Sequence, residues 1–172
     1  FHPKYAIAVY TILQRAEVSS NLARFDGIRY GHDRSFFGEE AKRRIMLGTY
    51  TLSAGYYDQY YNKALKVRTV IIEDFKKAFQ EVDIIIGPTA PTTALPIGAS
   101  KGQSMFGELA DVLVEPSSIA GLPGISVPIG FSKAGLPIGM QIIGPQFAEE
   151  IILNAAYQYE QENPLYVKKP KI

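Results

Sequence analysis

The sequence contains no cysteine, so disulfide bonds and thiolate chemistry are excluded. Its only histidines are His2 and His32, too little material for a Ser-His-Asp triad. No apolar run approaches the roughly 18 residues of a membrane helix, and no signal peptide is visible. There is no glycine-rich phosphate loop and no cluster of metal ligands. The net charge of +1 does not favour binding to nucleic acid or to a membrane.

The chain has 172 residues, of which 47% are hydrophobic, and this composition is ordinary for a soluble globular protein with a core. Nothing in the sequence marks a domain boundary or an internal repeat. The first residue is Phe1 and not methionine, so we expect the chain to be part of a longer protein.

Four segments have helical patterns. They are residues 4–23, 39–54, 55–81 and 146–163. In the first, apolar residues recur at spacings of three and four, from Ala6 to Ala16. The third carries lysines between its aromatic residues, which fits either an RNA-contacting helix or a solvated face, because acidic residues are interleaved with the lysines. The apolar content of the last segment comes from Phe147, Ile151, Leu153, Ala155, Tyr157 and Tyr159.

Residues 82–88 are predicted to form a strand, because a β-branched run there ends in a proline-rich segment. Residues 95–111 are predicted to be a linker, and the tail from Pro164 to Ile172 is expected to fray. Two further apolar runs, within residues 124–130 and 137–144, are separated by turn residues and predict neighbouring strands. Both are apolar at most positions, so we expect both faces of each strand to be covered.

Two charged residues stand in unusual places. Arg44 is set among small residues at the edge of the apolar stripe of the second helix, whereas Arg43 should face water. Such a guanidinium needs a partner, and an internal salt bridge is the alternative to binding a carboxylate of a ligand. Asp111 lies between apolar residues, where a helix cap or a salt bridge is the alternative to a binding role.

Three motifs resemble those of one enzyme family. The first is Ser-Ser-Asn-Leu-Ala-Arg-Phe-Asp-Gly at residues 19–27, and the second is the strand ending in Pro-Thr-Ala-Pro-Thr at residues 88–92. The third is the stretch at residues 115–130, with its Ala-Gly-Leu-Pro-Gly core. Together they resemble the C-terminal part of the amidase-signature enzymes, and among these the glutamine-hydrolysing subunits of amidotransferases that act on Glu-tRNA(Gln).

The resemblance implies an α/β fold with a mixed β-sheet flanked by helices on both faces. Residues 1–172 would be the C-terminal portion of a single amidase-signature domain. The family's Ser-Ser-Lys catalytic residues belong to an upstream Gly/Ser-rich signature, so we assign no catalytic residue in this chain. Members of the family usually have a longer loop at residues 31–38, so either the loop is truncated here or a mobile piece is absent from the sequence.

The resemblance also implies a glutamine-binding site. Tyr10 matches a family tyrosine that lines the glutamine pocket, Arg44 matches the arginine that holds the α-carboxylate, and Asp111 matches the aspartate that holds the α-ammonium. A free amino acid carries one charge of each sign, so its pocket needs one cation and one anion. Around Pro116 this chain has serines and an isoleucine where relatives more often have threonine and asparagine.

The intact protein is then expected to be a cytoplasmic carbon–nitrogen ligase with glutamine as amido donor. Its implied partners are a transamidase/kinase B subunit, a small C subunit, and Glu-tRNA(Gln) bound through the complex, with no membrane. The B subunit would use ATP and Mg, and this chain would use no cofactor. Two alternatives remain, namely another amidase-signature amide hydrolase and a non-catalytic scaffold or RNA-contacting domain.

Overall fold

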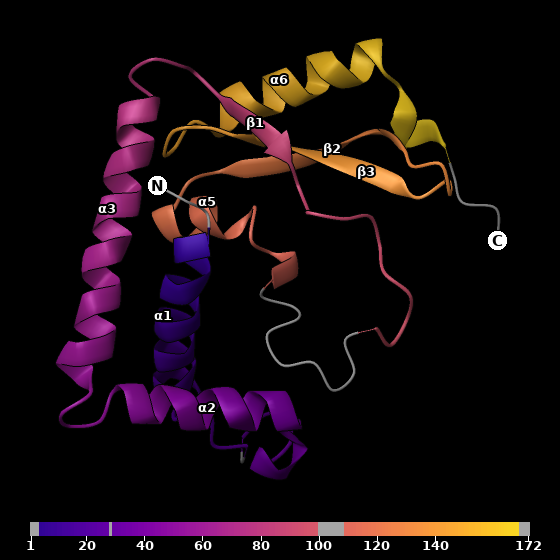
Figure 1. Cartoon of the computed structure of the whole chain (residues 1–172). Helices are drawn as coiled ribbons and strands as arrows, with labels where there is room; N and C mark the ends of the chain where they lie inside the picture. Colours follow the sequence, from indigo (N-terminus) through magenta and orange to yellow (C-terminus); the bar gives the residue numbers. More distant parts are fainter. Residues whose placement is uncertain (1–3, 28, 100–108, 169–172) are drawn as a thin grey trace. The chain divides into compact units, whose positions relative to one another are not determined.

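The computed structural model describes residues 4–27, 29–99 and 109–168 (Figure 1). The chain divides into two compact units, residues 8–70 and residues 1–7 with 71–172. The prediction of one amidase-signature domain over residues 1–172 stays a prediction.

The unit of residues 8–70 is helical. It contains most of α1 (Lys4–Leu22), the short η1 (Arg34–Phe36), α2 (Glu39–Thr51), η2 (Tyr57–Asn62) and the first half of α3 (Lys63–Ala78). Helix α1 buries the predicted stripe, since Val9, Leu13 and Ala16 are at most 7% exposed. The expected helices at 4–23 and 39–54 are therefore confirmed.

Helices α1 and α2 approach closely at Gly48. A Cβ atom at Gly48 would overlap the carbonyl oxygen of Arg15 and lie 2.8 Å from Cβ of Ser19. Only glycine lets the two backbones come this near.

The predicted single helix over residues 55–81 is wrong in its first part. Residues Tyr57–Asn62 form a π-helix, and the α-helix begins only at Lys63 and ends at Ala78. In the π-helical segment the aromatic rings pair along the chain, with ring centroids 5.2 Å apart for Tyr57 and Tyr61. A periodicity of three and four does not separate an α-turn from a π-turn, because both place residues four apart on one side.

The second unit contains a three-stranded sheet in the order β1-β3-β2. Its strands are β1 (Ile85–Pro88), β2 (Gly124–Phe131) and β3 (Pro137–Ile143), and both pairings are antiparallel. The strand expected at 82–88 is thus shorter than predicted, and the neighbouring strands β2 and β3 are confirmed as a hairpin.

Helix α6 (Glu149–Glu162) covers one face of this sheet (Figure 1). Val127 of β2 and Ile142 of β3 form a buried cluster with Ile152 and Ala156 of α6. Ile151, Leu153 and Tyr157 are also apolar residues of this helix, but each is at least 46% exposed. Residues four apart share a helix face, and here Ile152 and Ala156 define the inner face.

The short helix α5 (Glu115–Ala120) lies on the other side of the sheet in Figure 1. Pro116 is in its first turn, where a missing N–H costs nothing, and Gly121 ends it in a left-handed conformation with φ 72°. The Gln141 side chain of β3 is 8% exposed and joins three segments. Its Nε2 donates to the carbonyl oxygens of Pro88 and Leu113 at 3.0 and 2.9 Å.

Two expectations about exposure need correction. Strand β2 is not covered on both faces, because Ile129 and Phe131 are 40% and 39% exposed. The tail does not fray at residues 164–168, where η3 (Leu165–Val167) contacts β2. The Lys168 ammonium also lies 5.0 Å from the centroid of the Phe131 ring. Residues 169–172 lie outside the described residues, as do residues 100–108 of the linker expected at 95–111.

Candidate functional site

A carboxylate shared by two arginines defines the charged site of the helical unit. Nε of Arg44 lies 2.7 Å from Oε1 of Glu40, and Nη2 of Arg43 lies 2.7 Å from Oε2 of the same carboxylate. All three side chains come from consecutive turns of α2, where residues three and four apart are neighbours. Arg44 is the most covered, with 25% of its side chain exposed against 42% for Arg43 and 51% for Glu40.

The pKa values reflect this arrangement. The hydrogen bond from Arg44 holds the pKa of the Glu40 carboxyl below its usual range, with further help from Arg43. The same bond raises the pKa of the Arg44 guanidinium, and a hydrogen bond with Tyr10 adds to that effect. The carboxylate and the two guanidinium groups are therefore ionised as a cluster with one negative and two positive charges over the physiological pH range.

Tyr10 and Arg44 are brought together by the fold, from α1 and α2. The internal salt bridge that was the alternative explanation of Arg44 is present, with Glu40 as the partner. Glu40 is the residue of this cluster that the sequence-based prediction missed, although its spacing of four from Arg44 was a visible signal.

Asp111 belongs to the other unit, in the turn that leads into α5. It is exposed, and its backbone carbonyl accepts hydrogen bonds from the N–H groups of Val114 and Glu115, both at 3.0 Å. Within the described residues its carboxylate makes no hydrogen bond or ion pair, so Asp111 supports α5 by its backbone only. The three-residue glutamine site stays a prediction.

The Ser-Ser-Asn-Leu-Ala-Arg-Phe-Asp-Gly motif has a local structural role. Oγ of Ser19 donates to the carbonyl oxygen of Ala16 at 2.9 Å, as expected of a helix end. Arg34, from the following loop, donates to the carbonyl oxygens of Phe25 and Ala23 at 3.0 and 3.1 Å. The loop is thereby tied back to the motif. His32 stacks on Phe36 with ring centroids 4.0 Å apart, which gives this histidine a packing role.

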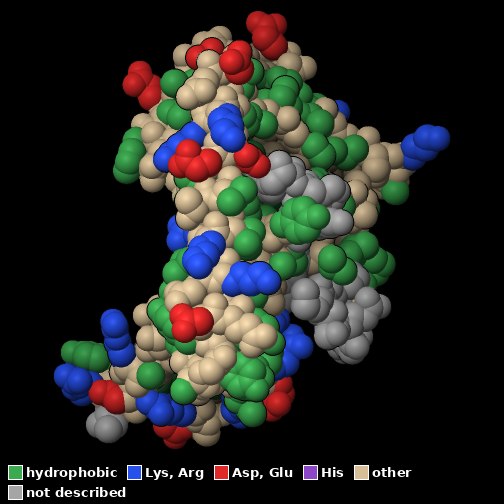
Figure 2. Space-filling view, turned by 60° about the vertical axis from the view of Figure 1, so that its left-hand side comes forward, with side chains coloured by type: hydrophobic (Ala, Val, Ile, Leu, Met, Phe, Trp, Pro, Cys, Tyr) green, Lys and Arg blue, Asp and Glu red, His purple; other side chains and the backbone are tan. Residues whose placement is uncertain are grey.

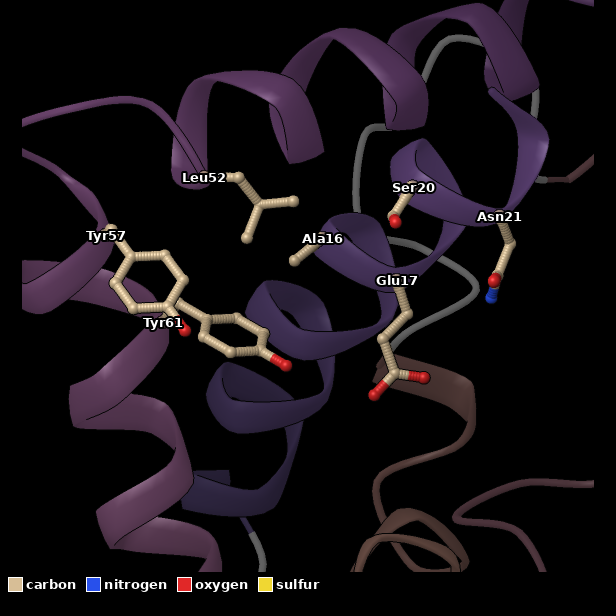
Figure 3. Close-up of a pocket in the computed structure, with 7 residues that line it drawn as sticks. All are labelled: Ala16, Glu17, Ser20, Asn21, Leu52, Tyr57 and Tyr61. Carbon is tan, nitrogen blue, oxygen red and sulfur yellow. The ribbon is translucent and has the colours of Figure 1, made fainter. Parts of the chain in front are cut away.

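A pocket of about 320 Å³ lies in the same helical unit. Figure 3 shows Tyr57 and Tyr61 on one side of it, and Glu17, Ser20 and Asn21 on the other. Its apolar lining comes from the side chains of Ala16 and Leu52. Among the described residues there is no group of three side chains that could hold a metal ion, and no helix long and apolar enough to cross a membrane.

A family model described as Amidase matches residues 1–153 of the chain. The chain is 51% identical to the A subunit of glutamyl-tRNA(Gln) amidotransferase from Streptococcus agalactiae serotype III, over 99% of the chain and 38% of the relative. It is 54% identical to the protein of that name from Thermoanaerobacter pseudethanolicus, over 98% of the chain and 38% of the relative. The chain thus spans less than half the length of these curated relatives.

Solved structures agree with this match. The A subunit of glutamyl-tRNA(Gln) amidotransferase from Thermotoga maritima is 44% identical, with a TM-score of 0.71 over 95% of this chain and 33% of that one. A 6-aminohexanoate cyclic dimer hydrolase has a TM-score of 0.78 at 21% identity, over 99% of this chain and 38% of that one, which shows the fold alone. The α/β fold of the amidase-signature enzymes is therefore confirmed.

The alignment to the streptococcal relative contains 186 positions, whereas this chain has 172 residues. The relative therefore has at least 14 residues with no counterpart here. This number agrees in size with a shortened loop, but it does not place the missing residues along the chain. The short loop at residues 31–38 stays a prediction.

Proposed function

The chain belongs to the amidase family, and from that membership we propose that it is the glutamine-recognising part of the glutamine-hydrolysing subunit in an amidotransferase that acts on Glu-tRNA(Gln). The observation that carries the proposal is the cluster of Tyr10, Glu40 and Arg44, which the fold assembles from two helices. Identities of 51% and 54% to two amidotransferase A subunits over nearly the whole chain support the choice of substrate.

The charges of the cluster suit a carboxylate ligand. Glu40 offsets only one of Arg43 and Arg44, so the cluster keeps a net charge of +1 in a partly covered place. Because Glu40 engages Nε of Arg44, it fixes the plane of the guanidinium, and a planar guanidinium recognises a carboxylate through two parallel hydrogen bonds. We assign Arg44 to the α-carboxylate of glutamine, Tyr10 to the wall of the pocket and Asp111 to the α-ammonium.

We assign no bond-breaking step to this chain. The intact protein would release ammonia from the glutamine side-chain amide and supply it for the conversion of Glu-tRNA(Gln) to Gln-tRNA(Gln). Its partners would be a transamidase/kinase B subunit, which uses ATP and Mg, and a small C subunit. Support for such a complex comes from the relatives, which are themselves named as subunits.

Steady-state glutaminase kinetics of the intact protein test the proposal. Arg44→Ala should raise KM for glutamine by about 10- to 100-fold, because a hydrogen bond to a charged group contributes about 1.5–3 kcal/mol. Lys42→Ala is the control, since it removes the same charge from an exposed residue of α2 outside the cluster and should change KM by no more than about 3-fold. Circular dichroism of both variants shows whether they fold. An unchanged KM in folded Arg44→Ala would rule out the recognition role.

The alternative of another amide hydrolase gives a different result in the same experiment. An enzyme for uncharged amides makes no use of Arg44, so its activity on propionamide would exceed its activity on glutamine and would not respond to Arg44→Ala.

The RNA-contacting alternative is weakened by the charges of α3. Lys76 pairs with Glu73 at 2.8 Å, and Lys77 lies 4.0 Å from Asp74. On the face shown in Figure 2, basic and acidic side chains are interspersed. A phosphate backbone is bound by an uncompensated basic surface, which this part of the helix does not offer.

A further inference from the structure

The pocket beside the π-helix has the features of a ligand site that is separate from the Arg44 cluster. We propose that it binds a small primary alkylammonium ion, held by the Glu17 carboxylate at one side and by the rings of Tyr57 and Tyr61 at the other. Each of the seven lining residues belongs to the helical unit of residues 8–70.

The charge of the lining selects a cation. Glu17 is the one lining residue that is charged at neutral pH, and no lysine or arginine lines the pocket. In the described part of the chain, no hydrogen bond or ion pair engages the Glu17 carboxylate. Glu40, by contrast, is held by two arginines. A carboxylate at a pocket wall without a neighbouring cation attracts a cationic ligand.

The aromatic side of the pocket also favours a cationic ligand. The ring centroids of Tyr57 and Tyr61 are 5.2 Å apart, with an angle of 33° between the ring planes. Tyr57 is 41% exposed, so its ring is accessible to a ligand. The face of an aromatic ring carries partial negative charge and attracts an ammonium group. Both rings come from the π-helix Tyr57–Asn62, and π-helical turns occur often at functional sites.

The remaining lining residues specify a primary ammonium with a short apolar stem. The side-chain oxygens of Ser20 and Asn21 can accept hydrogen bonds from N–H groups, which a quaternary ammonium lacks. Ala16 and Leu52 offer an apolar surface to the stem. A volume of about 320 Å³ equals that of about ten water molecules, which is at the small end of ligand pockets.

Calorimetric titration of the intact protein with n-butylammonium tests this site. We expect a dissociation constant on the order of 1 mM, and no detectable binding of 1-butanol, which has the same stem without the charge. Tetramethylammonium should bind more weakly than n-butylammonium, because it donates no hydrogen bond. If 1-butanol binds as well as n-butylammonium, the pocket is only apolar and the proposal is wrong.

Variants locate the binding. Glu17→Gln should weaken n-butylammonium binding by about 10-fold, since it removes the charged acceptor and keeps the side-chain shape. Glu162→Gln makes the same change on the exposed end of α6 and should have no effect. Tyr61→Leu should weaken binding by about 2- to 5-fold, whereas Tyr61→Phe, which keeps the ring, should weaken it less. Equal losses in Glu17→Gln and Glu162→Gln would mean non-specific attraction and would overturn the assignment. An affinity of Glu17→Gln for n-butylammonium equal to that of the wild type would also overturn the assignment. Neither result depends on glutamine hydrolysis.

Discussion

Oε1 of Glu40 lies 2.7 Å from Nε of Arg44, one turn further along α2. The contact is the internal salt bridge that was one of the two explanations of Arg44, and it also fixes the plane of the guanidinium. An exposed pair of this kind contributes little to stability, because solvent screens it. Its importance for the protein is therefore expected in ligand binding and not in folding.

The first prediction separates these two roles of Glu40. Glu40→Gln should change the free energy of unfolding by less than about 1 kcal/mol. It should raise KM for glutamine by about 3- to 10-fold with kcat nearly unchanged, because the guanidinium loses its fixed orientation. Denaturant unfolding and glutaminase kinetics measure the two effects. Glu39→Gln alters the same charge on the same turn and should leave KM as it is. A lower KM in Glu40→Gln would instead mean that Glu40 competes with the substrate for Arg44.

The second prediction concerns the crossing of α1 and α2. Gly48→Ala should destabilise the protein by about 1–3 kcal/mol, because the added methyl group overlaps the carbonyl of Arg15 and meets Ser19. Alanine would gain about 1 kcal/mol in helix propensity over glycine, which reduces this loss without reversing it. Urea unfolding gives the difference.

Gly87→Ala is the matched control, because no atom lies within 4 Å of a Cβ atom built there. Its unfolding midpoint should stay near that of the wild type. If Gly48→Ala is as stable as Gly87→Ala, the two helices are further apart than the structure shows.

Much of the local structure follows from spacing alone. The buried stripe of α1 from Val9 to Ala16 was predictable because three- and four-residue spacings place these side chains on one face. The inner face of α6 was not, because apolar residues occur all round this helix. Ile152 and Ala156 are buried while Ile151 is 46% exposed. Only the packing of the helix against Val127 and Ile142 of the sheet determines which residues are buried.

The candidate site was less predictable than the fold. Arg44 could be singled out by the small residues around it in the sequence. Glu40 could be found from its spacing of four residues to Arg44. Its contact with Tyr10 joins two helices, and sequence spacing holds no information on such a contact. The grouping with Asp111 came from the family resemblance. The pocket at Glu17 was not predicted because its lining comes from α1, Leu52 and the π-helical segment, and sequence spacing holds no information on contacts between separate segments.

The third prediction concerns a pair of tyrosines in the helical unit. The hydrogen bond with Tyr56 raises the pKa of Tyr50 to about 12, and the ring centroids are 4.3 Å apart. The folded-state pKa lies above the ordinary value of 10.0, so the protonated form favours the fold. This contribution is complete below about pH 10 and is lost as the pH rises through about 12.

Ultraviolet titration of tyrosinate formation measures this pair. The curve of the wild type minus that of Tyr50→Phe should show one tyrosine that ionises near pH 12. Tyr56→Phe should move this step down toward pH 10, because the hydrogen bond is lost. Tyr30→Phe, which removes a hydroxyl group outside the pair, should leave the step in place. A step that stays near pH 12 in Tyr56→Phe would assign the shift to a different neighbour.

The fourth prediction concerns the buried amide that joins β3 to two other segments. Gln141→Met keeps the length of the side chain but removes the donor to the carbonyl oxygens of Pro88 and Leu113. Both carbonyls then lose a partner in a place where Gln141 itself is 8% exposed. An unmet buried acceptor costs about 1–3 kcal/mol, whereas the gain from burying the methionine is smaller, because most of the chain stem was already buried. We therefore expect the free energy of unfolding, measured with urea, to fall by about 2 kcal/mol.

Gln158→Met on the exposed side of α6 is the control and should change stability by less than about 0.5 kcal/mol. Equal stability of the two variants would show that the Gln141 amide does not connect β1 and the approach to α5.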